Sequence, residues 1–357
     1  MKQDIWLAVS IYCISIIAAC SKPDNSKKPI VTPPPVQADT TFTNPLLSSG
    51  PDPWVLQEGG YYYYTNTSGN KIILRKTQYM DDLKDAPAIT VWTPPSDPTS
   101  PYNADIWAPE IHYLNNKWYI YFAADNNGNN SKHRIYVLEN SSNDPMSSAN
   151  WVFKGQLAAT TDKWAIDATV FMYKDTLYTA WSGWPGDIDG EQDIYIAKMS
   201  DPYTISGDRI MISKPIYGWE DNSININEGP EALINANGQL FVTYSANACW
   251  SDDYCLGLLT LKPNGSPMNP NDWTKSANPV FTKNTSGGAF GPGHNGFFLS
   301  PDGKENWIIY HANSLSGQGC GDQRNPRIQK FTWNNDGTPN FGIPTSINQS
   351  LINPSGK

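Results

Sequence analysis

Short strands joined by tight turns are what the pattern of apolar and polar positions predicts for most of this chain. Beyond Pro45, runs of four or five aromatic and β-branched residues alternate with clusters of Gly, Asn and Asp, and no long stretch has helical periodicity. One kind of run starts at residues 61, 118, 177, 240 and 307, so its starts lie 57, 59, 63 and 67 residues apart. Spacing of this kind indicates repeated structural units.

A second kind of apolar run follows the first in constant phase, at residues 72–74, 134–137, 193–196, 256–259 and 327–330. The turns before the first kind of run carry residues that tolerate a positive φ, namely Gly59-Gly60, Asn115-Asn116, Asn237-Gly238 and Asp302-Gly303. Each unit is therefore predicted to contain a strand, a tight turn and two further strands.

Units of this size, with three or four antiparallel strands, cannot bury a core alone and must stack on one another. Arranged around an axis, five of them form a five-bladed β-propeller, so the predicted fold class is all-β. A β-sandwich has a similar strand content, but it does not explain the constant phase of the five units.

The first 44 residues differ in composition from the rest. Residues 1–19 combine Lys2 with an apolar run from Ile5, and Ala18-Ala19-Cys20 resembles a bacterial lipobox. We expect residues 1–19 to be a lipoprotein signal peptide and Cys20 to be lipidated, with ordinary signal-peptidase cleavage as the alternative. Residues 20–44, rich in Ser, Lys, Pro and Thr, are expected to be a flexible tether, and residues 45–357 the propeller domain. The protein would then be anchored in the cell envelope, at the cell surface or in the periplasm.

Charge and aromatic content restrict the partners. A net charge of -9 argues against nucleic acid, and 14 Trp with 19 Tyr suit a surface on which sugar rings stack. Five cysteines are too few for a disulfide scaffold. Because Cys249 and Cys255 are close in sequence, we expect them to bridge, which leaves Cys320 unpaired.

Three carboxylates precede predicted inner strands: Asp52, Asp167 and Glu228. In a propeller such positions converge on the central channel, where the three acids repel one another and at least one pKa rises. A neutral carboxylic acid beside an ionised carboxylate is what glycoside hydrolysis requires. The alternative for each acid alone is a turn cap or an ion-pair partner.

Five short motifs together look like glycoside hydrolase family 43: residues 52–55 (DPWV), 107–111 (WAPEI), 166–168 (IDA), 227–230 (NEGP) and 291–295 (GPGHN). The resemblance covers about residues 44–344, and it implies an inverting glycosidase with a five-bladed propeller. It implies that Asp52 is the general base, that Glu228 is the general acid, and that Asp167 raises the pKa of the acid and orients it.

The same resemblance suggests three binding residues. Trp107 would form a wall of the sugar pocket, and Arg327 would be a channel arginine near the acid and the sugar. His294 would lie near the channel floor, close to a bound calcium ion. The residues themselves also allow blade packing for Trp107, a strand-end salt bridge for Arg327 and a buried hydrogen-bonded role for His294. A second calcium candidate, residues 125–130 (DNNGNN), lacks Gly at loop position six and Glu at position twelve, so we expect a hairpin tip there.

The resemblance is strongest to exo-acting α-L-arabinofuranosidases that release terminal α-L-arabinofuranose from arabinan or arabinoxylan. The expected partners are therefore arabinose- or xylose-containing oligosaccharides of plant cell walls. A β-xylosidase or an endo-arabinanase of the same fold is the alternative within the family. A non-catalytic glycan-binding propeller and a scaffold for protein partners are the alternatives outside it.

Overall fold

The computed structural model describes residues 40–222 and 224–357, and nearly all of their regular structure is β-strand. Four short 3-10 helices, η1 (Met80–Asp85), η2 (Asn130–Lys132), η3 (Ser148–Asn150) and η4 (Pro270–Asp272), complete the described elements. No helix in this part of the chain has the length and apolar character needed to cross a bilayer. The expected signal peptide and the lipidation site at Cys20 lie outside the described residues.

The strands form antiparallel groups of four in chain order. The first group is β2 (Trp54–Glu58), β3 (Tyr61–Thr65), β4 (Ile72–Thr77) and β5 (Ala88–Trp92). The second is β6 (Ala104–Leu114), β7 (Lys117–Asp125), β8 (Arg134–Asn140) and β9 (Trp151–Leu157). The last is β18 (Phe290–Leu299), β19 (Asn306–Asn313), β20 (Asn325–Trp333) and β21 (Pro339–Asn340).

Between them lies an eight-stranded sheet with two antiparallel halves. One half is β10 (Ala165–Tyr173), β11 (Thr176–Gly183), β12 (Glu191–Asp201) and β13 (Thr204–Ser213). The other is β14 (Asn225–Ile234), β15 (Leu240–Ala246), β16 (Cys255–Leu261) and β17 (Trp273–Lys275). Two parallel residue pairs between β12 and β14 join the halves. All ten apolar runs of the sequence lie in strands, as predicted, and the turn residues Gly59, Gly60, Asn115 and Asn116 have positive φ.

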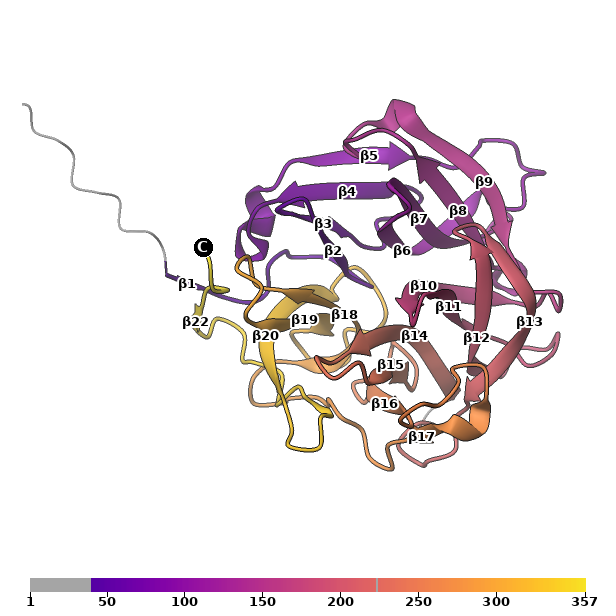
Figure 1. The fold of residues 1–357 in the computed structure, drawn as a ribbon. Coiled ribbons are helices and arrows are strands. Elements are labelled where there is room, and N and C mark those ends of the chain that lie inside the picture. The colour runs from indigo at the N-terminus through magenta and orange to yellow at the C-terminus, as the bar shows by residue number, and fades with distance from the viewer. Residues whose placement is uncertain (1–39, 223) are drawn as a thin grey trace, which may run out of the picture. The chain divides into compact units, whose positions relative to one another are not determined.

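The sheets are arranged around a common centre, with the first strand of each group innermost (Figure 1). Each first strand contacts the next one along the chain, and β18 contacts β2, so the ring closes. This arrangement is a β-propeller. Large hydrophobic clusters fill the spaces between successive sheets, and one of them joins Tyr62 and Tyr64 of β3 to Trp307 of β19. The core thus lies between the units, as expected for units that cannot fold alone.

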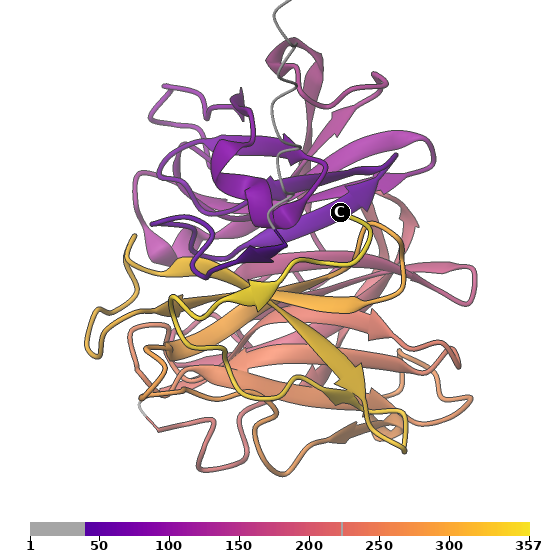
Figure 2. The same ribbon diagram turned by 90° about the vertical axis from the view of Figure 1, so that its left-hand side faces the viewer.

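The two ends of the described chain meet at the first and last sheets. β1 (Thr41–Phe42) pairs with β22 (Leu351–Ile352), and these segments lie side by side in both views (Figures 1 and 2). Asn44 is buried, donates from Nδ2 to the Ile328 carbonyl at 2.8 Å, and accepts the Ile328 N–H at 3.0 Å. Residues 40–44 therefore belong to the propeller and not to the tether, because these hydrogen bonds and the burial of Phe42 fix them there.

Candidate active site

A strained backbone position recurs where the chain enters each inner strand. The residues there have φ values of +54° (Asp52), +41° (Ala108), +57° (Asp167), +52° (Gly229) and +44° (His294). In β6, β10, β14 and β18 the ladder register is irregular at this point. A left-handed residue other than Gly costs about 1–3 kcal/mol. The bend turns the local side chains away from the regular alternation of the strand.

The three predicted acids do not occupy one equivalent position. Asp52 and Asp167 are the left-handed residues themselves, whereas Glu228 comes one residue earlier and corresponds to Trp107 and Ile166. In the unit of Glu228, Gly229 takes the left-handed position instead. Its N–H donates to Asp167 Oδ2 at 3.1 Å, which ties the backbone of one acid to the carboxylate of the other.

A cavity of about 700 Å³ brings most of the predicted site residues together. Asp52, Asp167, Glu228, Trp107 and His294 all line it. The acids therefore face a common space although they are far apart in sequence, and each is no more than 9 % exposed.

Asp52 is held in its ionised form. Its Oδ1 accepts from Arg324 Nη1 at 2.7 Å and its Oδ2 accepts from Thr67 Oγ1 at 2.7 Å. Burial alone would raise the pKa of Asp52, but Arg324, with smaller contributions from His294, His311 and the Thr67 hydrogen bond, holds it well below the ordinary range. The Asp52 N–H donates to His311 Nδ1 at 3.0 Å, so this nitrogen is unprotonated and His311 is neutral. Burial likewise lowers the pKa of His311, which leaves Arg324 as the main positive charge on Asp52.

Glu228 and Asp167 have the opposite character. Burial raises the pKa of Glu228 to about 7, with a further increase from Asp52 and an opposing hydrogen bond from the Tyr254 hydroxyl at 2.7 Å. Burial, followed by repulsion from Glu228 and Asp52, raises the pKa of Asp167 well above its ordinary value. Two such carboxyl groups cannot both ionise easily, so the pair retains a proton near neutral pH.

His294 lies beside Asp52, with Nδ1 at 3.4 Å from Oδ1, and burial lowers its pKa. Calcium prefers six to eight oxygen ligands. The carboxylate next to His294 is already engaged by Arg324 and Thr67, and within residues 40–222 and 224–357 His294 belongs to no cluster of His, Cys, Asp and Glu side chains with metal-ligand spacing. These side chains do not form a calcium cage around His294, so the calcium expected there stays a prediction.

The arginine at the site is Arg324 and not Arg327. Arg327 is fully buried and donates to the Asn325 side chain and the Gly288 carbonyl, at 2.8 and 2.9 Å. It does not line the cavity, whereas Arg324 does. The sequence could not separate the two, because the choice depends on β20 starting at Asn325, between them.

The disulfide also differs from the prediction. Cys249 bridges to Cys320, and Cys255 is a free, buried thiol. Cys255 begins β16 and its side chain packs in a hydrophobic cluster, so closeness in sequence did not bring it to Cys249. The bridge ties the loop after β15 to the loop that carries Arg324, and both its cysteines line the cavity. Trp250, 56 % exposed, lines the cavity next to it.

A propeller whose central cavity combines an ionised carboxylate with a carboxyl group that retains its proton has the site of a glycoside hydrolase. The sequence model described as glycosyl hydrolases family 43 matches residues 42–339, and the chain belongs to this family.

Two named relatives and a solved structure agree with this assignment. The chain is 40% identical over 319 residues to a Streptomyces avermitilis protein named extracellular exo-α-(1→5)-L-arabinofuranosidase; the match covers 87% of this chain and 65% of that protein. It is 37% identical over 274 residues to a Streptomyces chartreusis protein of the same name, covering 76% of this chain and 82% of the relative. The crystal structure of an α-L-arabinofuranosidase from Lactobacillus brevis superposes with a TM-score of 0.82 at 37% identity, covering 86% of this chain and 98% of that one. The chain thus spans about two thirds of the Streptomyces avermitilis relative.

Proposed function

We propose that this protein is an exo-acting, inverting α-L-arabinofuranosidase that releases terminal α-L-arabinofuranose from arabinan or arabinoxylan oligosaccharides. The observation that carries the proposal is that two carboxyl groups in one cavity differ in protonation. Arg324 stabilises the ionised form of Asp52, whereas the pKa of Glu228 is raised to about 7. The names of the relatives from two Streptomyces species support the sugar and the exo action.

The chemistry assigned to these residues is a single displacement. Glu228 donates its proton to the glycosidic oxygen while the bond from that oxygen to the anomeric carbon breaks. A water molecule attacks the anomeric carbon from the opposite face and gives its proton to Asp52, so the configuration inverts. In this proposal Asp167 helps to keep the proton on the pair that it forms with Glu228, because ionisation of both groups would bring two negative charges together.

Neighbouring side chains position the two reacting groups. Arg324 and Thr67 each bind one carboxylate oxygen of Asp52 and so fix its plane. The Tyr254 hydroxyl fixes Glu228. Trp107 supplies an aromatic wall for the sugar ring, since sugar C–H groups pack on aromatic faces. In this proposal the bridge between Cys249 and Cys320 holds the loops at the rim of the cavity, and these loops allow only the end of a glycan chain to enter.

We also propose that the propeller has five blades. Each four-stranded group counts as a blade if the two residue pairs between β12 and β14 are a contact between neighbouring blades. The recurrence of a left-handed residue at five corresponding positions supports this count.

Product analysis tests the activity. The full chain, incubated with arabino-oligosaccharides, arabinoxylan and xylobiose, is expected to release arabinose alone, with the β-anomer appearing first in a proton NMR time course. Xylose from xylobiose would favour a β-xylosidase, and oligosaccharides without free arabinose would favour an endo-arabinanase. Sugar binding without any hydrolysis would indicate a glycan-binding propeller, and no sugar binding would indicate a protein scaffold.

For the envelope location we propose a lipid anchor at Cys20, with residues 20–39 as the tether. Mass spectrometry of the mature N-terminus is expected to find a lipid-modified Cys20, and Cys20→Ala is expected to leave the membrane fraction. An unmodified N-terminus would contradict the anchor.

For calcium, we propose a structural ion near His294, as the family likeness implies. An unfolding temperature that exhaustive chelation leaves unchanged would rule out a structural ion there.

A further inference from the structure

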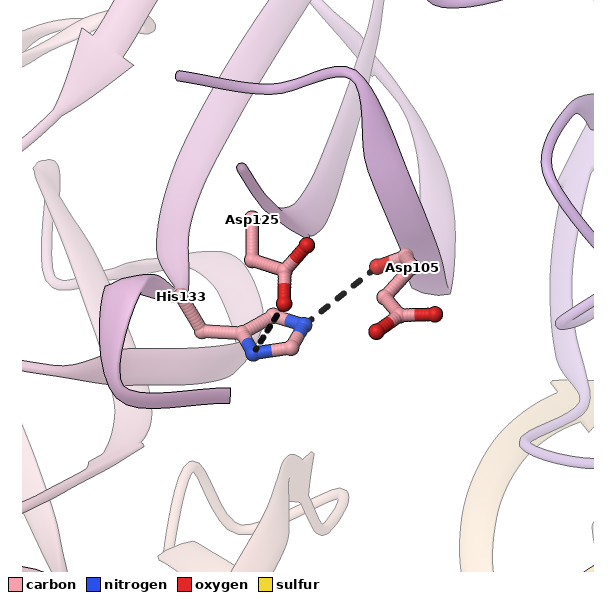
Figure 3. Close-up of side chains that lie close together, drawn as sticks. All are labelled: Asp105, Asp125 and His133. Atoms are coloured by element: carbon pink, nitrogen blue, oxygen red, sulfur yellow. Dashed lines mark hydrogen bonds and ion pairs between the residues drawn. The ribbon is translucent and has the colours of Figure 1, made fainter. Parts of the chain in front are cut away.

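Beside the cavity, three metal-binding side chains come together: Asp105 of β6, Asp125 at the end of β7 and His133 after η2 (Figure 3). Their ligand atoms lie within 4.8 Å of one another, and among residues 40–222 and 224–357 this is the one group of three or more His, Cys, Asp or Glu side chains with that spacing. We propose that this group binds a divalent transition-metal cation, of which Zn²⁺ is the representative.

An unpaired oxygen points into the group. Asp125 is fully buried; its Oδ1 accepts the Gly128 N–H at 3.0 Å, whereas its Oδ2 has no hydrogen-bond partner among the described residues. This Oδ2 faces His133, with Nδ1 at 3.8 Å, too far for a hydrogen bond (Figure 3). A buried carboxylate oxygen without a partner is costly, and a cation between the three side chains would satisfy it.

Among the described residues, neither acid has a lysine or arginine as a partner. In the described part of the chain, no lysine or arginine nitrogen lies within 4.0 Å of the carboxylate of Asp105 or Asp125. Arg134, next to His133 in sequence, pairs instead with Asp162 at 2.8 Å. The site therefore has two carboxylates, one imidazole and a deficit of positive charge.

The histidine is oriented as metal-ligating histidines usually are. His133 is fully buried, with Nδ1 at 3.1 Å from the Asn130 carbonyl. A proton on Nε2 donates to the Asp105 backbone oxygen at 3.3 Å and leaves the Nδ1 lone pair free to bind a cation next to Asp125 Oδ2. A ligating His typically donates its other ring N–H to a backbone carbonyl or a carboxylate.

The donor set selects the class of cation. Imidazole suits zinc and its neighbours in the first transition row, whereas calcium prefers six to eight oxygens. Residues 125–130 form the tip of the β7–β8 hairpin, as the sequence predicted, and only Asp125 of that loop belongs to the group. The site is therefore not a calcium loop of the helix-loop-helix type.

A cation here would stabilise one wall of the cavity. The Trp107 ring stacks on the His133 ring, with centroids 4.0 Å apart and planes at 24°, and Trp164 meets it edge-on at 6.2 Å. Both tryptophans and Asp105 line the cavity. The cation would fix the aromatic wall through His133 and take no part in proton transfer.

The zinc affinity of the full chain tests the site. Bound metal is first removed with a chelator, and the affinity for added zinc is then measured in competition with a chromophoric chelator. Asp125→Asn is expected to weaken binding by about 100-fold or more, because loss of even an outer-shell partner costs about 10–100-fold. The matched control is Asp162→Asn, which removes a half-exposed carboxylate near the same hairpin and is expected to bind zinc like the wild type. All three proteins carry the same cysteines, so zinc held by thiols cancels in the comparison.

A crystal soaked in zinc is expected to show an anomalous peak between Asp105, Asp125 and His133. Equal zinc affinity in the wild type and Asp125→Asn, a peak located elsewhere, or tighter binding of Ca²⁺ than of Zn²⁺ would each overturn the proposal. If Asp125→Asn does not fold, Asp105→Asn, at a partly exposed position, takes its place with the same expected loss. The readout is cation binding, so it does not depend on the glycosidase assignment.

Discussion

Removal of the positive charge next to Asp52 should move the acidic limb of the pH profile. In the wild type, Arg324 Nη1 lies 2.7 Å from Asp52 Oδ1 and keeps the pKa of this buried acid below its ordinary range. A general base must be ionised, so wild-type kcat/KM is expected to stay nearly constant as the pH falls through the mildly acidic range. In Arg324→Gln the burial that raises the pKa of Asp52 is no longer opposed by the guanidinium.

The size of the effect follows from the contact. Charge centres about 4 Å apart at an effective dielectric constant of about 20 interact by about 4 kcal/mol. At 1.36 kcal/mol per pKa unit this corresponds to a change of about 3 units, at the upper end of the 1–3 units that a neighbouring charge commonly causes. We therefore expect the pKa of Asp52 to rise by about 1–3 units, and activity to be lost as the pH falls through the new value.

The assay is kcat/KM for an arabino-oligosaccharide across the acidic and neutral range. Arg324→Lys is the control, since it keeps the charge and loses the planar guanidinium, so its acidic limb should move much less. The alkaline limb, which reports deprotonation of Glu228 near pH 7, should stay in place in Arg324→Lys and move to higher pH in Arg324→Gln, because the Arg324 charge also lowers the pKa of Glu228. If both variants lose activity equally at every pH, Arg324 only binds substrate and the reasoning about Asp52 is refuted.

Four further perturbations test other parts of the site. Glu228→Gln is expected to lower kcat by about 10²–10⁴-fold on natural oligosaccharides and much less on aryl arabinofuranosides with good leaving groups. Asp52→Asn should be inactive on both substrates. If Glu228→Gln loses the same activity on both substrates, Glu228 is not the general acid. Replacement of Cys249 and Cys320 by Ser should lower the free energy of unfolding by about 2–4 kcal/mol in denaturant titrations, since the bridge joins residues 71 positions apart. The same replacement should reduce kcat, because the bridge holds the loop that carries Arg324. An unchanged free energy of unfolding would contradict this. Trp250→Ala should raise KM about two- to tenfold for oligosaccharides but not for aryl substrates, if Trp250 stacks on the sugar of the leaving group, because an aromatic contact contributes about 0.5–1.5 kcal/mol. An equal rise in KM for both substrates would exclude this role of Trp250.

The fold could be predicted from the sequence because its signal is local and repeated. Strand runs, hairpin turns such as Gly59-Gly60, and their constant phase follow from backbone preferences that act within a few residues. The convergence of Asp52, Asp167 and Glu228 on one cavity could be predicted for the same reason, since these residues stand next to strands whose phase the sequence shows. The exact position of each acid within its repeat could not be predicted, because the left-handed residue is Gly229 and not Glu228.

The residues that were missed depend on contacts between loops. Arg324 lies outside β20, and its partner Asp52 is 272 positions away in sequence. Cys249 pairs with Cys320 for a similar reason, because two loops from different sheets meet at the rim of the cavity. No periodic pattern records such a meeting, so proximity in sequence favoured Cys255 and a family likeness favoured Arg327.

The repeated left-handed position explains how one backbone design provides different chemistry in each unit. The same bend carries the proposed base Asp52, a second carboxyl group at Asp167, a small residue at Ala108 and an imidazole at His294. At Gly229 the absence of a side chain matters: a Cβ there would lie 3.2 Å from the His294 ring, and the bare N–H binds Asp167. The unit that supplies Glu228 therefore places its acid one residue earlier and uses the bend itself to hold the neighbouring carboxylate. These bends thus position the acids relative to one another: Asp167 lies at one bend and lines the cavity, and the Gly229 N–H at the next bend donates to Asp167 Oδ2 beside Glu228.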